Sequence, residues 1–395
     1  MKTFFPLFVV LALLVLTPAK ARSVHKKVNV DSLLQAAVEH SIHGRFTESN
    51  ADFNSLLNDC KLRRKSKSMV EGLYLESMFR GMDYKGCYNL MVKSVGKRRA
   101  DKNEMIKSLA IQPVPYLKRP ERDVVIPFDT DSVFSDNEYR GKLITLPTVI
   151  NGKEERMIFD NGCTLMCTSS NTFAREHNIR PIGANIEIAS ITTDLTTWIG
   201  IADSIVIGDL VFKNVLFNVS PDDAYGKEIP RKAVLGSNIF YMMGEMVFDN
   251  RDKTLSLPWN QDCRESNLTM QGNGRHLVEV VIGEDTMQMH FDLGTVSTNL
   301  NKNYFDKHKE MILSNGTVKT SSYGGIGGSK TATVYELKDI TLKSCGGEYR
   351  RKTMRVNPGR KIKYDFDFGQ LGNDFLLSFE RVILNLRNMY LYIEK

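Results

Sequence analysis

Two stretches of this chain, MIFDNGC at residues 157–163 and MHFDLGT at residues 289–295, end an apolar run with an aspartate followed by x-Gly. Each is followed later by an apolar–Gly–x–Asn/Asp stretch, VLGSNIF at residues 234–240 and QLGNDFL at residues 370–376, which leads into another apolar strand pattern. The two aspartates lie 132 positions apart (292 − 160) and the two glycines lie 136 positions apart (372 − 236). These nearly equal offsets indicate that one structural unit occurs twice.

The two copies span about residues 123–260 and 268–395, which is too long for a solenoid repeat and is typical of a duplicated lobe. Short apolar runs punctuated by Gly, Asn and Asp, such as residues 142–150, 156–159 and 211–219, are typical of β-strands. Hydrophobic residues make up 42% of the chain and charged residues 25%, the mixture of a packed protein, so disorder, collagen-like repeats and a multi-span membrane protein are poor fits. The sequence therefore predicts a mainly β fold with two duplicated lobes.

The duplicated Asp-x-Gly motif places one carboxyl group, Asp160 or Asp292, at the end of an apolar strand in each lobe. If the lobes pack about a pseudo-twofold axis, the two carboxyl groups meet. Two such groups within a few ångströms cannot both ionise easily, so they share a proton. One can then take a proton from water while the other polarises a scissile carbonyl. A lone Asp-x-Gly is usually a turn, but two copies in register favour the catalytic interpretation.

On these motifs, residues 123–395 resemble the aspartic peptidases, in particular bacterial exported two-lobed proteins built from retropepsin-like units. The resemblance implies two retropepsin-like (acid-protease) β-barrel lobes with Asp160 and Asp292 as the catalytic pair. It also implies a peptide or protein substrate bound in an extended conformation, with no metal and no organic cofactor. In that family the apolar–Gly segment packs behind the catalytic loop.

The resemblance further implies a β-hairpin flap that closes over the peptide. In the second lobe, YGGIGGS at residues 323–329 lies where such a flap belongs, although an exposed flexible loop is the alternative. In the first lobe, ASITT at residues 189–193 occupies the matching place. The flap candidates are Ile191, Thr192, Gly325, Ile326 and Gly327.

Both motifs depart from the family pattern Asp-Thr-Gly-Ser/Ala. The family's Thr, which braces the two catalytic loops, is Asn161 in one lobe and Leu293 in the other, and a leucine side chain cannot form a hydrogen bond. Two alternatives therefore stay open: a catalytically weak or inactive peptide-binding pseudopeptidase, and an enzyme that uses Cys163 as a nucleophile. The predicted supports of the two catalytic loops are Asn161, Gly162, Cys163, Gly294 and Thr295.

The N-terminus carries a lysine, an apolar run from Phe4 to Leu16 and a small-x-small site before residue 22, which together are typical of a signal peptide at residues 1–21. We therefore expect an exported protein, periplasmic or extracellular, with no transmembrane segment after cleavage. Export permits disulfides, and Cys60 with Cys87 is the one pair that we would guess among the six cysteines.

Residues 22–110 have a helical pattern that begins after a possible cap at Asp31 and contains two glycine turns, at residues 44–46 and 81–84. The pattern loosely resembles tetratricopeptide-type helical hairpins, and the prolines of residues 111–122 indicate a linker. We expect this helical module to be a possible docking site for a protein partner. Its basic runs lack the interleaved aromatic residues of a nucleic-acid site, so nucleic acid is not an expected partner.

Overall fold

The computed structural model describes residues 29–135, 138–189, 194–226, 229–261, 264–271, 274–359 and 365–394. The predicted signal peptide lies outside the described residues. Contacts divide the chain into two compact units, residues 1–112 with 270–274, and residues 113–269 with 275–395. The two units are described separately below.

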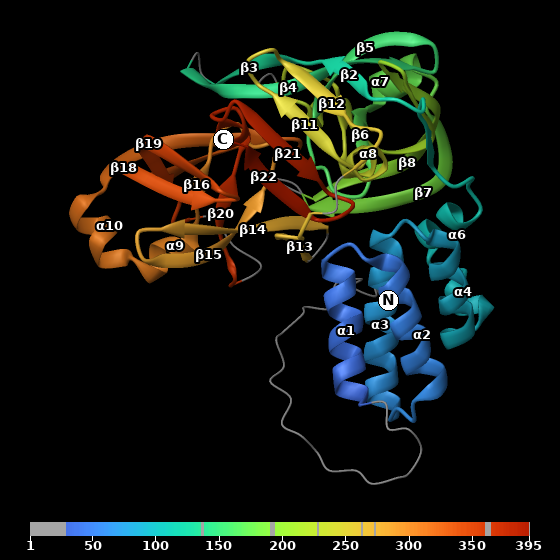
Figure 1. Cartoon of the computed structure of the whole chain (residues 1–395). Helices are drawn as coiled ribbons and strands as arrows, with labels where there is room; N and C mark the ends of the chain where they lie inside the picture. Colours follow the sequence, from blue (N-terminus) through green and yellow to red (C-terminus); the bar gives the residue numbers. More distant parts are fainter. Residues whose placement is uncertain are drawn as a thin grey trace. The chain divides into compact units, whose positions relative to one another are not determined.

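The first unit is built from helices, coloured blue to teal in Figure 1: α1 (Val30–Ile42), α2 (Phe46–Asp59), α3 (Arg64–Arg80), α4 (Tyr84–Val95), α5 (Lys97–Ala100) and α6 (Glu104–Ala110). The cap of α1 is Asn29, whose side chain accepts the backbone N–H groups of Asp31 and Ser32. Asp31, the expected cap, lies instead in the first turn, where its charge is favourable at the positive end of the helix dipole. The two glycine turns fall between α1 and α2 and between α3 and α4.

One core cluster of the helical unit consists of Ala37, Phe53, Leu56 and Val70, with apolar side chains of α1 to α3 packed around them. The guessed disulfide is wrong, because the cysteines at positions 60 and 87 are both free. The thiol of Cys87 instead donates to the carbonyl of Leu75 at 3.5 Å inside the helical packing. The tetratricopeptide resemblance stays a prediction.

The first lobe is one nine-stranded sheet in the order β1-β9-β6-β10-β5-β4-β8-β7, with β3 paired to β4 and β8 paired also to β9. Strand β1 falls inside the segment expected to be a linker, and its pairing with β9 makes it an edge strand of this lobe. The strands are β1 (Tyr116–Lys118), β3 (Asp129–Ser135), β4 (Glu138–Ile150), β5 (Lys153–Phe159), β6 (Cys167–Ser170), β7 (Arg180–Ala189), β8 (Asp194–Ile207), β9 (Leu210–Ser220) and β10 (Ala233–Leu235), and the helices are α7 (Asn171–Glu176), the 3₁₀ turn η1 (Asp222–Ala224) and α8 (Ser237–Met243).

The second lobe repeats this plan in an eight-stranded sheet with the order β13-β14-β15-β20-β16-β19-β18-β17, and β14 also pairs with β18. Its strands are β13 (Leu268–Gln271), β14 (Arg275–Ile282), β15 (Asp285–Phe291), β16 (Asn299–Leu300), β17 (Thr317–Gly325), β18 (Gly328–Ser344), β19 (Gly347–Val356) and β20 (Asp367–Leu371), and its helices are α9 (Lys302–Lys307), α10 (Lys309–Asn315) and α11 (Asn373–Leu376). In both lobes a strand that precedes a glycine, β10 or β20, runs parallel to the strand that ends at the aspartate, β5 or β15. The structure is therefore mainly β with two lobes, as the sequence predicts.

A third sheet joins the two lobes in the order β2-β12-β11-β21-β22, where the strands are β2 (Val124–Pro127), β11 (Met246–Asp249), β12 (Thr254–Leu257), β21 (Arg381–Asn385) and β22 (Tyr390–Glu394). At its centre β11 of the first lobe pairs antiparallel with β21 of the second, and Val247 lies opposite Ile383. These two residues are 136 positions apart (383 − 247), the same offset as the repeated glycines. Each therefore faces its own counterpart, and the pseudo-twofold axis passes between them.

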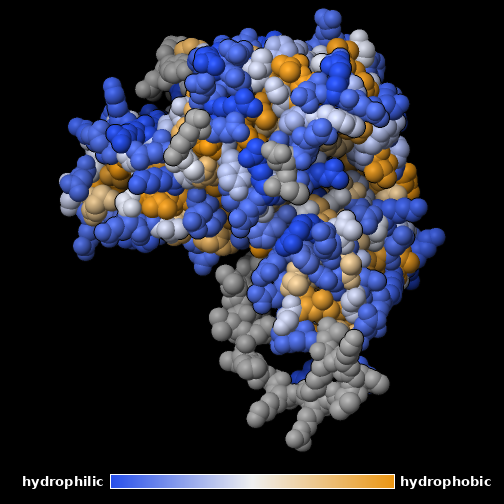
Figure 2. Space-filling model, viewed as in Figure 1, coloured by the Kyte–Doolittle hydropathy of each residue, from blue (hydrophilic) through white to orange (hydrophobic). Residues whose placement is uncertain are grey.

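The core of the first lobe carries stacked aromatic rings directly behind the Asp160 loop. Phe159 and Phe240 stack with their ring centroids 3.7 Å apart, and both are fully buried. Figure 2 shows mostly hydrophilic residues on the face that it presents, with hydrophobic residues in small scattered groups. Among the residues that the structure describes, no helix is long and apolar enough to cross a membrane.

Candidate active site

The two repeated aspartates each follow directly on a buried strand, Asp160 after β5 and Asp292 after β15. The backbone N–H of Asp160 donates to the carbonyl of Leu235 at 3.1 Å, and the N–H of Asp292 donates to the carbonyl of Leu371 at 3.0 Å. The strand pairs β5–β10 and β15–β20 thus hold the two loops in the same way. The backbone of the two aspartate loops is therefore held alike, as the duplicated sequence leads one to expect.

The glycine after each of these leucines allows the loop to pack closely behind its aspartate. A side-chain carbon at Gly236 would lie 1.9 Å from the carbonyl oxygen of Met166, and one at Gly372 would lie 2.4 Å from that of Thr295. No side chain fits at such distances, because real carbon contacts are well above 3 Å. The apolar–Gly segment therefore backs the aspartate loop in both lobes.

The aspartate loops of the two lobes meet face to face. A carbon added at Gly162 would lie 2.2 Å from Oδ1 of Asp292 and 2.9 Å from Oδ1 of Asp160, so both carboxyl groups reach the same point. Reciprocally, a carbon added at Gly294 would lie 2.3 Å from Oδ2 of Asp160. Each glycine makes room for the carboxyl group of the opposite lobe, and the structure brings the two predicted catalytic aspartates together.

The carboxyl group of Asp160 lies in an apolar setting. Its Oδ1 accepts the backbone N–H of Gly162 at 2.6 Å, and its Oδ2 accepts the thiol of Cys163 at 3.3 Å. Burial, and then the charge of the neighbouring Asp292, raises the pKa of Asp160 to about 7. Because desolvation disfavours the charged form, Asp160 keeps its proton across the acidic range.

The carboxyl group of Asp292 has a more polar surrounding. Oδ1 accepts the backbone N–H of Gly294 at 2.9 Å, and Oδ2 accepts both the hydroxyl of Thr295 and the side-chain amide of Gln370, each at 3.1 Å. The imidazole Nδ1 of His290 lies 3.7 Å from the same Oδ2. Thr295 was a predicted support of this loop; Gln370 and His290 were not.

The Asn161 side chain links the two loops, at the position where the family has a threonine. Its Nδ2 donates to the carbonyl of Phe291 at 2.8 Å, and its Oδ1 accepts the backbone N–H of Leu293 at 2.9 Å. Leu293 is fully buried and takes part through its backbone, and its carbonyl accepts the side chain of Asn373. One asparagine thus makes two hydrogen bonds across the lobe boundary, and the leucine opposite needs no polar side chain.

A buried histidine completes the surroundings of Asn161. Nδ2 of Asn161 lies 3.3 Å from Nδ1 of His276, and Nε2 of His276 lies 2.8 Å from the hydroxyl of Tyr241. Burial lowers the pKa of His276 to about 3, so the ring is neutral. An amide nitrogen only donates, so Nδ1 accepts and the ring proton is on Nε2, facing Tyr241. No local sequence pattern indicates this contact, since His276 lies 115 positions from Asn161.

The predicted flap of the second lobe is the hairpin of β17 and β18. Gly325 pairs with Gly328 at its tip, and the backbone N–H of Gly327 donates to the carbonyl of Ala224 in the first lobe at 2.8 Å. Ile326 packs against an apolar cluster built on Leu143, Ile158 and Val234, all of the first lobe. The tip therefore spans from one lobe to the other. The flap candidates Ile191 and Thr192 lie outside the described residues.

The thiol of Cys163 is poorly suited to be a nucleophile. Burial, followed by the charge of Asp160, raises the pKa of the Cys163 thiol well above its ordinary value. A catalytic cysteine needs the opposite shift, because the thiolate is the reactive form. In this structure the thiol is a hydrogen-bond donor to Asp160.

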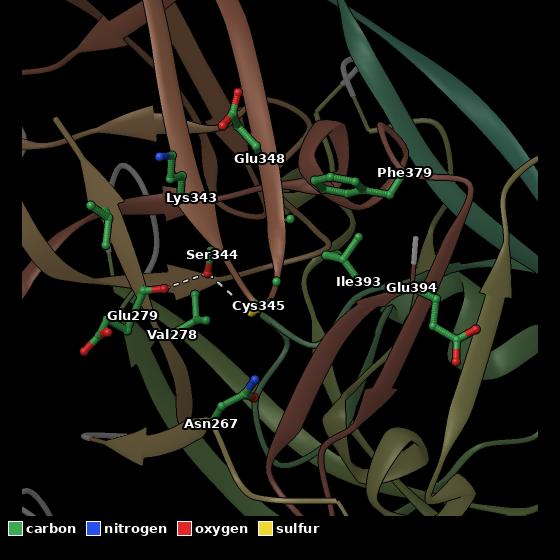
Figure 3. Close-up of a pocket in the computed structure, with 13 residues that line it drawn as sticks. Asn267, Val278, Glu279, Lys343, Ser344, Cys345, Glu348, Phe379, Ile393 and Glu394 are labelled. Carbon is green, nitrogen blue, oxygen red and sulfur yellow. Dashed lines mark hydrogen bonds between the residues drawn. The ribbon is translucent and has the colours of Figure 1, made fainter.

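A surface pocket of about 680 Å³ lies at the turn between β18 and β19 and contains none of the predicted site residues (Figure 3). Ser344 at its centre donates to the carbonyl of Glu279 at 2.6 Å. Burial raises the pKa of the adjacent Cys345 thiol to about 11. Within the described part of the chain, no group of three or more His, Cys, Asp or Glu side chains is placed to hold a metal ion.

Comparison with known proteins gives one family match. Residues 146–239, which include Asp160 and the Leu235-Gly236 segment, match the aspartyl protease family. No curated protein sequence matches the chain.

Two solved structures are similar to parts of the chain. A retropepsin-like aspartic protease from Rickettsia conorii is 15% identical, with a TM-score of 0.24, over 34% of this chain and 98% of that one. Conglutin gamma, a basic 7S globulin from lupine seeds, is 9% identical, with a TM-score of 0.41, over 68% of this chain and 94% of that one.

Proposed function

We propose that this chain, whose residues 146–239 match the aspartyl protease family, is an aspartic endopeptidase that hydrolyses peptide bonds with a water activated between Asp160 and Asp292. The observation that carries the proposal is the meeting of the two carboxyl groups at Gly162, with reciprocal contact at Gly294. The raised pKa of Asp160, about 7, supports it, because a shared proton requires one of the two groups to stay neutral.

The reaction needs only this pair and water. One carboxylate takes a proton from water as the water oxygen bonds to the scissile carbonyl carbon, and the other carboxyl group gives its proton to the carbonyl oxygen. In the resulting diol, the C–N bond breaks as the protonated carboxyl group passes its proton to the leaving nitrogen. The other carboxylate recovers a proton from a diol hydroxyl. Atoms and protons balance, and both carboxyl groups return to their starting states.

The Asn161 contacts support activity despite the altered motif. Catalytic groups must be held to within about half an ångström of the productive geometry. Asn161 makes two cross-lobe hydrogen bonds, to Phe291 and Leu293, and these fix the Asp160 loop against the Asp292 loop. The brace that the family builds from two threonines is thereby supplied by one asparagine.

The β17–β18 hairpin supports an extended peptide as the substrate. A strand-like peptide can bind through its backbone groups beneath such a hairpin, and closure of the hairpin excludes water from the reacting bond. On the N-terminal sequence pattern we further propose that the protein acts outside the cytoplasm, in the periplasm or the extracellular space. We also propose that the helical unit, α1 to α6, serves to dock a protein partner.

The test is cleavage of a denatured protein mixture at several values between about pH 3 and pH 8. The parent chain is compared with Asp160→Asn, Asp292→Asn and Cys163→Ser. We expect the parent and Cys163→Ser to cleave, and both asparagine variants to be inactive. Loss of activity in Cys163→Ser alone would favour a thiol enzyme. A parent that binds peptides without cleaving them at any pH would favour a peptide-binding pseudopeptidase.

A further inference from the structure

The two halves of the candidate active site are not equivalent. In the first lobe the strand pair behind the aspartate places Ile158 opposite Val234. In the second lobe the corresponding pair is His290 opposite Gln370. Two apolar residues in one copy of the repeat are therefore replaced by two polar residues in the other, at the same register beside the reacting carboxyl groups.

The apolar half belongs to a packed cluster. Ile158 and Val234 are buried together with Leu143, and Cys163 and Ile326 pack against them. Asp160 lies beside this cluster, and from its own lobe it accepts a backbone N–H and a thiol. A thiol is a weak donor, so little in this half compensates the loss of solvent around a charged Asp160.

The polar half directs strong donors at Asp292. A carboxylate oxygen has two lone pairs, and Oδ2 of Asp292 accepts the Gln370 amide and the Thr295 hydroxyl, each at 3.1 Å. Both lone pairs of that oxygen are occupied, so a proton on it would displace a donor. An amide nitrogen cannot reverse its role and accept. The remaining site, on Oδ1, already receives the N–H of Gly294 and faces the carboxyl group of the opposite lobe.

We propose that Gln370 and His290 are positioning residues that keep Asp292 ionised, so that Asp292 is the base that takes the proton from water and Asp160 is the acid. The inference rests on the proposed peptidase function and assigns the two roles that it leaves open. The titratable groups that face Asp292 are Asp160 and Cys163 from the first lobe and His290 from its own strand. The imidazole Nδ1 of His290, 3.7 Å from Oδ2, adds a further polar group beside the same carboxylate.

The test makes the second lobe resemble the first. Gln370→Val and His290→Ile each install the residue of the other copy, and Gln370→Met keeps the side-chain length without a donor. Gln288→Val, a loss of an amide two residues before His290 on β15, is the matched control. The carboxyl carbons of isotopically labelled aspartates are followed by NMR as the pH is changed. The signals of the pair are assigned with Asp160→Asn and Asp292→Asn. The pH dependence of kcat/KM is measured for the same variants.

In the parent we expect Asp292 to lose its proton at a lower pH than Asp160. Gln370→Val and Gln370→Met are expected to raise the midpoint of the Asp292 titration by about one pH unit, the usual size of such an effect. The acid limb of the kcat/KM profile should shift to higher pH by the same amount. At pH values below that limb, activity should fall about tenfold. Gln288→Val should change neither.

The inference is overturned if Asp292 titrates above Asp160, or if both Gln370 variants leave the Asp292 midpoint in place while they remain folded by thermal unfolding. The NMR titration does not need turnover, so it decides the inference even if the chain fails to cleave peptides. Cleavage that depends on both aspartates, combined with a reversed order of titration, would leave the proposed function standing and remove the assignment of roles.

Discussion

Oδ1 of Asn161 accepts the backbone N–H of Leu293 at 2.9 Å across the boundary between the lobes. The same side chain donates to Phe291 at 2.8 Å, so both ends of one amide are used to join the two aspartate loops. The contact explains how a leucine can stand at position 293, where the family pattern has a threonine. It also makes the geometry of Asp292 depend on a residue of the other lobe.

Removal of the Asn161 amide should therefore reduce both stability and activity. Asn161→Leu leaves the Phe291 carbonyl and the Leu293 N–H buried without partners, at a cost of about 1–3 kcal/mol each. We expect a loss of about 2–5 kcal/mol in the free energy of unfolding by chemical denaturation, with kcat/KM reduced at least about tenfold. Asn161→Thr, whose hydroxyl can donate and accept, should lose less. Equal losses in the two variants would contradict a hydrogen-bonding role.

The raised pKa of Asp160 predicts how stability changes with pH. The folded state holds this proton up to about pH 7, whereas the ordinary pKa is 3.8. Between these values the folded state binds more protons than the unfolded state, so the stabilising contribution is complete at low pH and is lost as pH rises toward 7. The change is up to about 4 kcal/mol.

Asp160→Asn removes this titration. Denaturant unfolding of the parent at several pH values should show stability falling between about pH 4 and pH 7, and Asp160→Asn should show a smaller fall. The same slope in both proteins would mean that Asp160 does not hold a proton in the folded state over this range.

The contact of the flap with the first lobe predicts a role for Ile326. Ile326→Ala removes apolar area from the cluster of Leu143, Ile158 and Val234, worth about 2 kcal/mol of flap closure. We expect kcat/KM for a peptide to fall roughly thirtyfold, mainly through KM. Val318→Ala is the control, because this residue of the same hairpin is 60% exposed. A comparable loss in the control variant would remove the special role of the tip.

The sheet that joins the lobes predicts where stability is concentrated. Ile383, opposite Val247 at the pseudo-twofold axis, is 1% exposed, whereas Val125 on the outer strand β2 is 59% exposed. Ile383→Ala should lower the free energy of unfolding by about 2–5 kcal/mol, and Val125→Ala by less than about 0.5 kcal/mol. Similar losses in the free energy of unfolding for Ile383→Ala and Val125→Ala would show that the centre of this sheet does not hold the lobes together.

The duplicated Asp-x-Gly and Leu-Gly segments were sufficient to predict two β lobes, because nearly equal offsets between repeated motifs, 132 and 136 positions, indicate two copies of one fold. The offset of the repeated glycines, 136 positions, appears again in the pairing of β11 with β21, where Val247 faces Ile383. The segment after residue 110 was less predictable, since its prolines are typical of a linker, and an edge strand such as β1 tolerates them. The turn candidates at Gly44 and Gly81 lie between helices, as the sequence predicts.

The polar residues that surround the aspartates were harder to predict from the sequence. His276 contacts Asn161 from 115 positions away, and no local pattern encodes such a distance. Gln370 and His290, however, stand at strand positions that are apolar in the other copy. A comparison of the two copies position by position would have marked them, because a polar residue in a buried strand position needs a partner.

The most direct test of the central claim is a single-turnover comparison of the parent and Asp292→Asn on one identified peptide, with the products followed by mass spectrometry and the affinity measured separately. The account predicts that the variant binds the peptide with a similar Kd and cleaves it at least about a thousandfold more slowly, because the peptide still binds while the pair that activates water is lost. Cleavage by Asp292→Asn at the rate of the parent would contradict a reaction that takes place between Asp160 and Asp292.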